Sequence, residues 1–139
     1  MKTKVPVYKI MTPLPIRLNP KDSIQKAAFI MNDLGIRHLP VVKDSEVIGI
    51  ISYSDILRIN ELDREKILSD NLMTTPAITI KESETLEELA PLFTTKKLHA
   101  VPVLDYENKL IGIVSTIDII KFMYDYIQTE KVWEREYQN

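Results

Sequence analysis

The chain has 139 residues, of which 45% are hydrophobic and 27% charged, and its formal net charge at pH 7 is −2. This composition is typical of a globular protein with one compact domain or two closely packed small ones. The absence of cysteine excludes disulfide bonds, thiolate metal sites and a cysteine nucleophile. Nucleic-acid-binding proteins usually carry a basic excess, because neutralised phosphates supply most of their affinity, and this sequence has no such excess.

No segment of the sequence suggests a membrane or secreted protein. The longest apolar run, Val47–Ile51, is far too short to span a bilayer. The N-terminal residues Met1–Pro6 lack the apolar segment of a signal peptide. Together with the absence of cysteine, these features lead us to expect a soluble cytoplasmic protein that binds neither membranes nor nucleic acids.

The sequence contains two copies of one unit. Met11–Thr12 recurs 62 positions later as Met73–Thr74, and this offset holds as far as Val42. The second copy then gains one residue, so that Ile48–Ser52 recurs 63 positions later as Ile111–Ser115. A register kept over so many apolar and glycine positions, with its single slip in a polar stretch, indicates a duplicated fold.

The first copy begins with a short strand and a helix. Pro15–Leu18 alternates in polarity, which predicts the strand. Asp22 or Ser23 then caps a helix whose apolar residues keep helical spacing as far as Leu34. Gly35 follows as a helix stop, because glycine readily adopts the left-handed conformation that ends many helices.

A hairpin and a second helix complete the first copy. Two apolar runs, His38–Val42 and Val47–Ile51, flank the polar stretch Lys43–Glu46. This arrangement predicts a β-hairpin, and the nearly continuous valine and isoleucine runs indicate strands that are buried on both faces. Ser52–Asp55 then begins the closing helix, with the serine as its cap.

The second copy predicts the same elements. Ala77–Ile80 is the short strand, and Thr85–Glu88 has the residue pattern of a capping box at the start of the next helix. Pro91 lies inside that helix, where it either kinks the helix or shifts its start. Lys97 replaces the glycine stop and suits the negative end of the helix dipole.

The second hairpin comprises Ala100–Leu104 and Leu110–Val114, and Ser115–Asp118 begins the last helix. This helix is expected to continue past Met123 toward Trp133. Its final turns either dock on a partner or fold back on the core of the protein, and the charged residues among them read as a solvated face.

We therefore predict an α+β fold with α/β-like units, in which each copy has the order β-α-β-β-α. A unit of roughly 50 residues buries too little core to be stable alone. We expect the two units to pack sheet to sheet about a pseudo-twofold axis. The domain boundaries are expected at residues 7–61 and 69–126, followed by a helical tail at 127–139.

Two motifs in each copy resemble those of the CBS domain, which is named after cystathionine β-synthase. They are His38–Val42 with a Gly-Ile-Ile-Ser-x-x-Asp junction that ends at Asp55, and His99–Val103 with the matching junction that ends at Asp118. The resemblance covers about residues 7–125 and is that of a tandem CBS pair, or Bateman module. It implies a regulatory homodimer that binds AMP, ADP or ATP, or another adenosyl ligand such as S-adenosylmethionine or NAD.

The resemblance also implies two ligand clefts between the copies, each with an aspartate that binds the ribose hydroxyls. The cleft of Asp55 would be lined by Thr74, Pro76, Ala77, Ile78, Leu98 and His99. The cleft of Asp118 would be lined by Thr12, Leu14, Pro15, Ile16, Ile36 and Arg37.

The chemistry of an adenine nucleotide adds further candidates. A carboxylate accepts strong hydrogen bonds from two vicinal hydroxyls at once. Ile50, Ile78 and Ile113 would supply apolar walls for the purine. Ser52 and Ser115 begin helices, whose free N–H groups and positive dipole ends suit phosphate.

The resemblance assigns phosphate contacts to three more residues. Arg37 and His99 correspond to phosphate-contacting basic residues of several relatives, and Ser54 corresponds to a phosphate-contacting serine. The second copy has Ile117 in place of that serine, a departure that argues against tight phosphate binding beside Asp118.

Each candidate also has a structural explanation. Asp55 and Asp118 each follow a serine by three residues, which is the spacing of a capping box that stabilises a helix without any ligand. Arg37 and His99 would then be solvated charges at a strand edge, and His38 a structural or exposed strand residue.

The methionines and glycines that recur in both copies have similar alternatives. Met11 and Met73 are expected to fill the core. Gly49 and Gly112 either ease strand packing or allow a ligand to approach closely.

The sequence does not suggest an enzyme. The Gly-x-x-x-x-Gly-Lys phosphate loop, the Gly-x-Ser-x-Gly elbow and the His-Glu-x-x-His metal motif are all absent. We expect no catalytic residue, no metal and no required cofactor. The alternatives are a structural dimerisation module with vestigial sites and a nucleotide-hydrolysing enzyme. The homodimer would form through the helices at residues 24–34 and 53–60, and any regulated target would be a separate protein.

Overall fold

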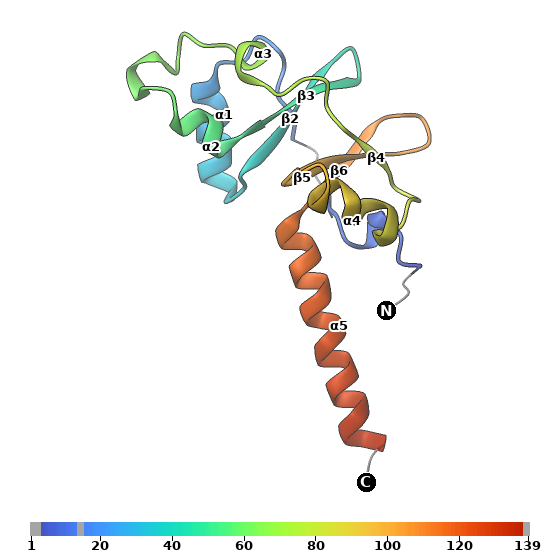
Figure 1. The fold of residues 1–139 in the computed structure, drawn as a ribbon. Helices are drawn as coiled ribbons and strands as arrows, with labels where there is room; N and C mark the ends of the chain where they lie inside the picture. The colour runs from blue at the N-terminus through green and yellow to red at the C-terminus, as the bar shows by residue number, and fades with distance from the viewer. Residues whose placement is uncertain (1–3, 14–15, 138–139) are drawn as a thin grey trace.

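The computed structural model describes residues 4–13 and 16–137, the last seven of them as backbone only. Two lobes of mixed α+β structure lie side by side, and one long helix leaves them (Figure 1). The elements in chain order are η1 (Val7–Lys9), β1 (Thr12–Pro13), α1 (Ile24–Leu34), β2 (His38–Lys43), β3 (Glu46–Ser52), α2 (Tyr53–Leu57), η2 (Glu61–Asp63), α3 (Ser69–Leu72), β4 (Ile80–Lys81), α4 (Leu86–Thr94), β5 (Ala100–Leu104), β6 (Leu110–Ser115) and α5 (Thr116–Tyr137).

The helix and hairpin of the first half form as predicted. The Ser23 side chain caps α1 by accepting a hydrogen bond from the Lys26 backbone N–H, and Gly35 ends the helix at φ +66°. The hairpin β2–β3 turns at Asp44 and Ser45, both with positive φ. This conformation matches the right-handed twist of the two strands.

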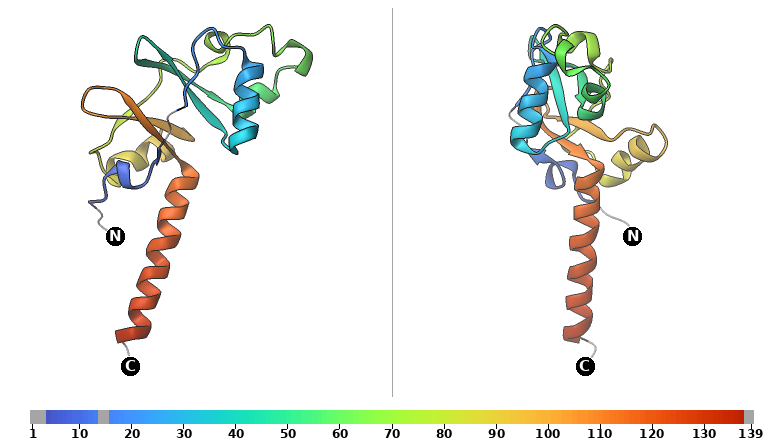
Figure 2. Two further views of the ribbon diagram at one scale, coloured as in Figure 1. Left: turned by 180° about the vertical axis from the view of Figure 1, so that it is seen from behind. Right: turned by 90° about the vertical axis from the view of Figure 1, so that its left-hand side faces the viewer.

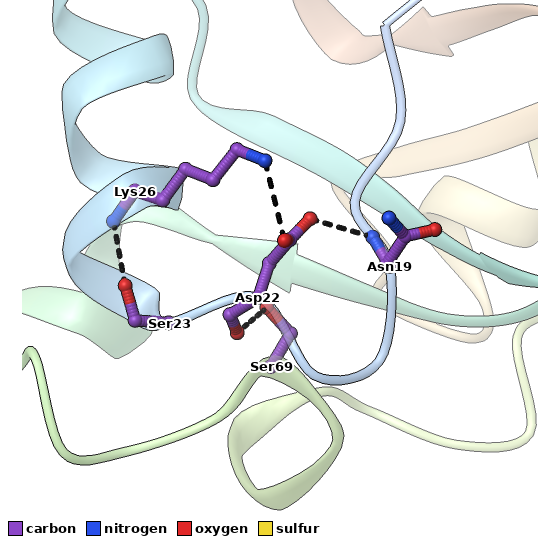
Figure 3. A network of polar contacts seen from close by, with 5 residues as sticks. All are labelled: Asn19, Asp22, Ser23, Lys26 and Ser69. Carbon is purple, nitrogen blue, oxygen red and sulfur yellow. Dashed lines mark hydrogen bonds and ion pairs between the residues drawn. The ribbon is translucent and has the colours of Figure 1, made fainter.

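A network of polar contacts ties α1 to the linker between the two halves (Figure 3). The Asp22 carboxylate accepts hydrogen bonds from the Asn19 backbone N–H at 2.8 Å and from the Lys26 ammonium at 3.2 Å. The Ser69 hydroxyl, at the start of α3, donates to the Asp22 carbonyl at 2.8 Å. The linker is thereby held against the first half.

The predicted capping box at the start of α4 is wrong. Thr85 is the N-cap residue, but its side chain makes no capping hydrogen bond. The N-terminal segment takes over this role, because Thr85 forms a β-bridge with Pro6 and the Leu86 N–H donates to the Val5 carbonyl. Pro91 lies inside α4, so the helix neither starts nor stops at the proline.

The residues that begin each copy pair with the opposite half. β1 is antiparallel to β6, with Thr12 opposite Ile113, so the second sheet has the order β1-β6-β5-β4. In the same way, Thr74 forms a bridge with Ile50 on β3. Each half therefore contributes an edge to the other, in a pattern that the pseudo-twofold relation of the copies requires.

The recurring glycines allow this exchange of edges. A Cβ on Gly49 would lie 2.5 Å from the Met73 sulfur, and a Cβ on Gly112 would lie 2.6 Å from the Met11 sulfur and 2.8 Å from the Thr12 carbonyl oxygen. Of the two explanations for these glycines, the structure supports close strand packing.

The first strands are shorter and placed differently than predicted. In the described part of Pro15–Leu18, only Leu18 forms a β-bridge, which is parallel to Val41. In the second copy the strand begins at Ile80 rather than at Ala77. The reason is the exchange of edges, because the residues that start each copy run along the opposite half before they reach their own.

The two halves pack through their sheets. Each half has its own buried cluster, centred on α1, β2 and β3 in the first and on α4, β5 and β6 in the second. A third cluster joins them, in which buried Ala100 and Ile113 pack against Ile16, Ile36 and Ile50. This cluster confirms the predicted sheet-to-sheet packing.

The helix α5 leaves the body as a straight rod (Figures 1 and 2). Its predicted continuation past Met123 toward Trp133 is confirmed. The alternative that its final turns fold back on the core is wrong, since α5 points away from both lobes in all three views. Within the described residues, no helix is both long and apolar enough to cross a membrane.

Candidate functional site

A cavity of about 600 Å³ lies between the two halves, where the β3–α2 and β6–α5 junctions approach each other. Its walls come from both copies of the repeat. They consist of Thr12, Gly35, Ile36, Arg37, His38, Ser52, Tyr53, Ser54, Leu57, His99, Ala100, Ile113, Ser115, Thr116, Ile117, Asp118 and Lys121.

The carboxylate of Asp118 is held in a fixed orientation in this cavity. Its Oδ2 accepts hydrogen bonds from the Ser115 backbone N–H at 2.8 Å and from the Ser115 hydroxyl at 3.1 Å. In return, the Asp118 N–H donates to the Ser115 hydroxyl at 3.3 Å. This is the capping box that the spacing predicts, and it positions the side chain without a ligand.

The second oxygen of the carboxylate faces the opposite half. Asp118 Oδ1 accepts a hydrogen bond from the Thr12 hydroxyl at 3.0 Å. An ionised carboxylate has about four acceptor positions, so Oδ1 retains capacity for a further donor. The capping box, which uses Oδ2, therefore leaves Oδ1 able to accept a further hydrogen bond.

The cavity is apolar beside this carboxylate. Ala100 and Ile113 are buried there, and Ile36 packs against them from the first half. Such a surface suits the face of an aromatic base, because burying apolar area contributes about 25 cal/mol per Å².

Four basic side chains surround the same cavity, although the chain as a whole is acidic. They are Arg37 and His38 from the first half, and His99 and Lys121 from the second. The guanidinium of Arg37 lies 5.8 Å from the centre of the Tyr53 ring, which is within the range of a cation–π interaction. Arg37 and Lys121 carry a formal positive charge and Asp118 a negative one, so the lining has a small excess of positive charge.

The environment of His38 disfavours its charged form. Burial lowers the pKa of His38 below its ordinary value of 6.5, the charges of His99 and Arg37 lower this pKa further, and Asp55 opposes them. Within the described residues, the imidazole makes no hydrogen bond. It is half-buried and faces the cavity as a neutral, unpaired group at pH 7.

The surroundings of Asp55 differ from those of Asp118. Asp55 also belongs to a capping box, with Ser52, but its Oδ1 lies 3.8 Å from the guanidinium of Arg58. Lys121 occupies the equivalent position in the second copy and lines the cavity without an ion pair to any described residue. Arg58 thus partly neutralises Asp55, whereas Lys121 remains available to a ligand.

The structure brings together about half of the site residues that the sequence predicts. Those that line the cavity are Thr12, Ile36, Arg37, Ser52, Ser54, His99, Ile113, Ser115 and Asp118. Ser54 and His99 lie in the cavity of Asp118, whereas the resemblance places His99 in the cleft of Asp55. Ile16 packs behind the wall, in the cluster of Ala100 and Ile113.

The other predicted residues lie outside this cavity. Ile50, Asp55, Thr74, Pro76, Ala77 and Ile78 do not line it. Thr74 instead pairs with Ile50 through two backbone hydrogen bonds of 2.9 and 3.2 Å. Leu14 and Pro15 fall outside the described residues.

Several cavity residues were missed, and His38 and Lys121 are the most informative of them. His38 was treated as structural because no partner for it could be named, although it follows Arg37 directly. Lys121 lies one helical turn after Asp118, and this spacing was a usable signal. Tyr53, Leu57, Ala100 and Thr116 gave no signal of their own.

Metal ligands do not cluster in the part of the chain that the structure describes. No three histidine, aspartate or glutamate side chains there come close enough to hold a metal ion.

Comparison with known proteins identifies the family. The model of the CBS domain family matches the chain twice, over residues 7–61 and 68–125. The chain belongs to the CBS domain family. The resemblance found in the junctions that end at Asp55 and Asp118 is thereby confirmed, and the protein is a tandem CBS pair.

Relatives in sequence carry such a pair within larger enzymes. Inosine-5′-monophosphate dehydrogenase of Methanocaldococcus jannaschii is 34% identical over 107 residues, which are 76% of this chain and 21% of that enzyme. The CBS pair thus spans about a fifth of the length of this relative.

Two relatives in structure are CBS pairs in complex with adenosyl compounds. One crystal structure, of a CBS domain pair in complex with 5′-methylthioadenosine and S-adenosyl-L-methionine, has 30% identity and a TM-score of 0.78, and covers 89% of this chain and 99% of that one. The other, of CBSX2 from Arabidopsis thaliana in complex with AMP, has 25% identity and a TM-score of 0.74, and covers 88% and 98%.

Proposed function

We propose that this CBS pair is a regulatory module that binds an adenine nucleotide in the cavity of Asp118. The observation that carries the proposal is the orientation of this carboxylate, which the capping box presents beside an apolar wall and four basic groups. These are the groups that a ribose, a base and a phosphate each require. Because such nucleotides are cytoplasmic metabolites, we also propose a cytoplasmic location.

The charges of the cavity favour AMP, ADP or ATP over S-adenosylmethionine. Arg37 and Lys121 are positive, Asp118 is negative, and two histidines add to the positive side when protonated. A phosphate is attracted to this arrangement, whereas a sulfonium cation is repelled. One related structure contains AMP and the other S-adenosyl-L-methionine, and we propose that the charge around this cavity favours the first class.

A thermal-shift panel followed by calorimetry tests the proposal. The ligands are AMP, ADP, ATP, NAD, S-adenosylmethionine and methylthioadenosine, each at millimolar concentration. We expect stabilisation by the phosphorylated compounds, since a ligand that binds only the folded state raises its stability. If none of the ligands stabilises the protein, the alternative of a structural module with vestigial sites is correct.

The substitution Asp118→Ala locates the site. Hydrogen bonds to a charged group contribute about 1.5–3 kcal/mol, so we expect affinity to fall about ten- to hundredfold in calorimetry. Asp125→Ala is the matched control, because Asp125 is exposed on the same helix outside the cavity. Equal affinities for Asp118→Ala and the wild type would contradict the assignment.

We propose that Asp55 marks at most a weaker second site. Its ion pair with Arg58 and its position outside the cavity support this ranking. The substitution Asp55→Ala is therefore expected to leave the tightest binding event within about threefold of the wild type, and a loss as large as that of Asp118→Ala would contradict it.

We further propose that the protein is not an enzyme and acts on a separate target protein. The cavity holds two histidines and one carboxylate, but among the described residues this carboxylate hydrogen-bonds with Ser115 and Thr12 and with neither histidine. Incubation with ATP and magnesium should therefore release no phosphate above the rate of a matched Asp118→Ala control.

We also propose a homodimer that forms through the exposed apolar side chains of α1, α2 and α5. Phe29, Leu57 and Ile120 are 69%, 57% and 61% exposed, and Leu57 and Ile120 are equivalent in the two copies. Apolar side chains exposed in this way commonly mark contacts between proteins. Sedimentation at micromolar concentration should show a dimer, and Leu57→Asp combined with Ile120→Asp should give a folded monomer.

A further inference from the structure

We propose that His38 takes up a proton when an anion enters the cavity, so that the affinity for phosphorylated ligands rises as the pH falls. This inference rests on the proposed function for its natural ligand, but not for its test, because an inorganic anion probes it as well.

The position of His38 sets up this response. It is the first residue of β2, half-buried, and its imidazole faces the cavity without a hydrogen bond to any described residue. A half-buried ionisable group with no partner is a group that a ligand can supply with one.

The groups around His38 are mostly cationic. Arg37 precedes it in the chain, His99 faces it from the residue before β5, and Lys121 lies across the cavity on α5. The carboxylates nearby are those of Asp55 on α2 and Asp118 on α5. Asp55 forms an ion pair with Arg58, and Asp118 accepts hydrogen bonds from Ser115 and Thr12. In the empty cavity, the neutral imidazole is therefore favoured.

An anion changes this balance. A phosphate or sulfate among Arg37, Lys121 and the two histidines places negative charge beside the imidazole, and it also accepts a hydrogen bond from the protonated ring. Both effects raise the pKa of His38, whereas in the empty protein burial and the neighbouring cations lower it.

Linkage then fixes the sign of the pH dependence. Because the anion raises the affinity of His38 for a proton, a proton raises the affinity for the anion by the same factor. The effect appears between the two pKa values of His38, that of the occupied cavity above and that of the empty cavity below. One proton changes the affinity by at most about tenfold per pH unit.

His99 is the other imidazole in the lining of this cavity. His99 is exposed, whereas His38 is half-buried. His99→Gln is therefore the matched control for His38→Gln, since both remove one imidazole from the same cavity.

The first measurement follows the imidazole signals by NMR from pH 5 to 8.5, with and without sodium sulfate. Sulfate keeps its charge over this range, so it contributes no titration of its own. We expect sulfate to move the midpoint of His38 upward. If neither sulfate nor ATP moves this midpoint, the inference is wrong.

The second measurement is calorimetry with ATP at pH 6.0 and 7.5, in buffers of different ionisation enthalpy. We expect the wild type to take up a proton when it binds ATP. Lowering the pH from 7.5 to 6.0 should raise its affinity about three- to tenfold more than it raises that of His38→Gln. This variant supplies the baseline, because it retains the titration of the nucleotide itself. His99→Gln should keep most of this difference. The inference is wrong if His99→Gln abolishes the difference and His38→Gln preserves it.

The two measurements separate this inference from the proposed function. A shift of His38 with sulfate, without any binding of adenine nucleotides, supports the inference and refutes the proposed function. Tight binding of ATP with an unchanged His38 midpoint supports the proposed function and refutes the inference.

Discussion

The glycines at positions 49 and 112 show how a single side chain permits the exchange of strand edges. Each lies against a methionine that arrives from the other half of the repeat. The two contacts differ, because a Cβ on Gly49 would meet only the Met73 side chain, whereas a Cβ on Gly112 would also meet the backbone oxygen of Thr12. A flexible methionine can move aside, but a paired strand cannot.

This difference predicts unequal costs for two equivalent substitutions. We expect Gly112→Ala to lower the free energy of unfolding by about 2–3 kcal/mol and Gly49→Ala by about 1 kcal/mol, within the usual range for overpacking. Urea denaturation measures both. The added substitution Met73→Ala should compensate part of the Gly49→Ala loss, whereas Met11→Ala should not compensate Gly112→Ala. Equal losses, or compensation in both pairs, would contradict this explanation.

At the scale of elements, the capping boxes connect folding with the site. Ser115 caps α5 and at the same time orients the Asp118 carboxylate. Ser23 caps α1 in the same way but lies outside the cavity. Ser23 thus only caps its helix, whereas Ser115 caps α5 and also orients Asp118.

This comparison predicts that removing the two caps has similar effects on stability but different effects on nucleotide binding. Both Ser23→Ala and Ser115→Ala should lower the free energy of unfolding by about 1 kcal/mol, because each removes a capping side chain. Only Ser115→Ala should also weaken nucleotide binding, by about three- to tenfold, as one of the two hydrogen bonds that hold Asp118 Oδ2 is lost. Calorimetry at fixed temperature, with the folded fraction checked by circular dichroism, measures this. Equal binding by the two variants would contradict the positioning role of Ser115.

The sequence predicted those elements whose signals are local. The helix α1 with its cap and glycine stop, both hairpins and the capping boxes of Asp55 and Asp118 follow from residue types at fixed spacings. The first strands and the capping of α4 were mispredicted, because their backbone partners come from distant segments, Val5 and Pro6 in the case of α4.

The candidate site was predictable to a similar extent. Asp118, Thr12 and Arg37 follow from the repeat and the resemblance, and the structure brings them to one cavity. His38 was missed because an unpaired histidine gives no signal until its surroundings are known. The resemblance places His99 beside Asp55, whereas the structure places it in the cavity of Asp118, and its role at either aspartate stays a prediction.

At the scale of the whole molecule, the exchanged edges make the two halves interdependent. Thr12 pairs with Ile113, and Thr74 pairs with Ile50. When either half unfolds, a strand of the other half therefore loses its backbone pairing partners. The shared cluster of Ala100, Ile113 and Ile50 adds apolar contacts across the same boundary. This arrangement suits a module that senses a ligand between its halves, because the free energy of binding then stabilises the entire fold.

The interdependence predicts that both halves unfold in one cooperative transition. Ile51→Val removes one methyl group from the buried cluster of the first half and should cost about 0.5–1.5 kcal/mol. In hydrogen exchange at a fixed protein concentration, the slowest amides of β5 and β6 should then lose as much protection as those of β2 and β3, about two- to tenfold. Protection lost only in β2 and β3 would show that the first half opens alone. The exchanged edges would then be too weak to couple the two copies, and the ligand cavity would lie between two independently folding lobes.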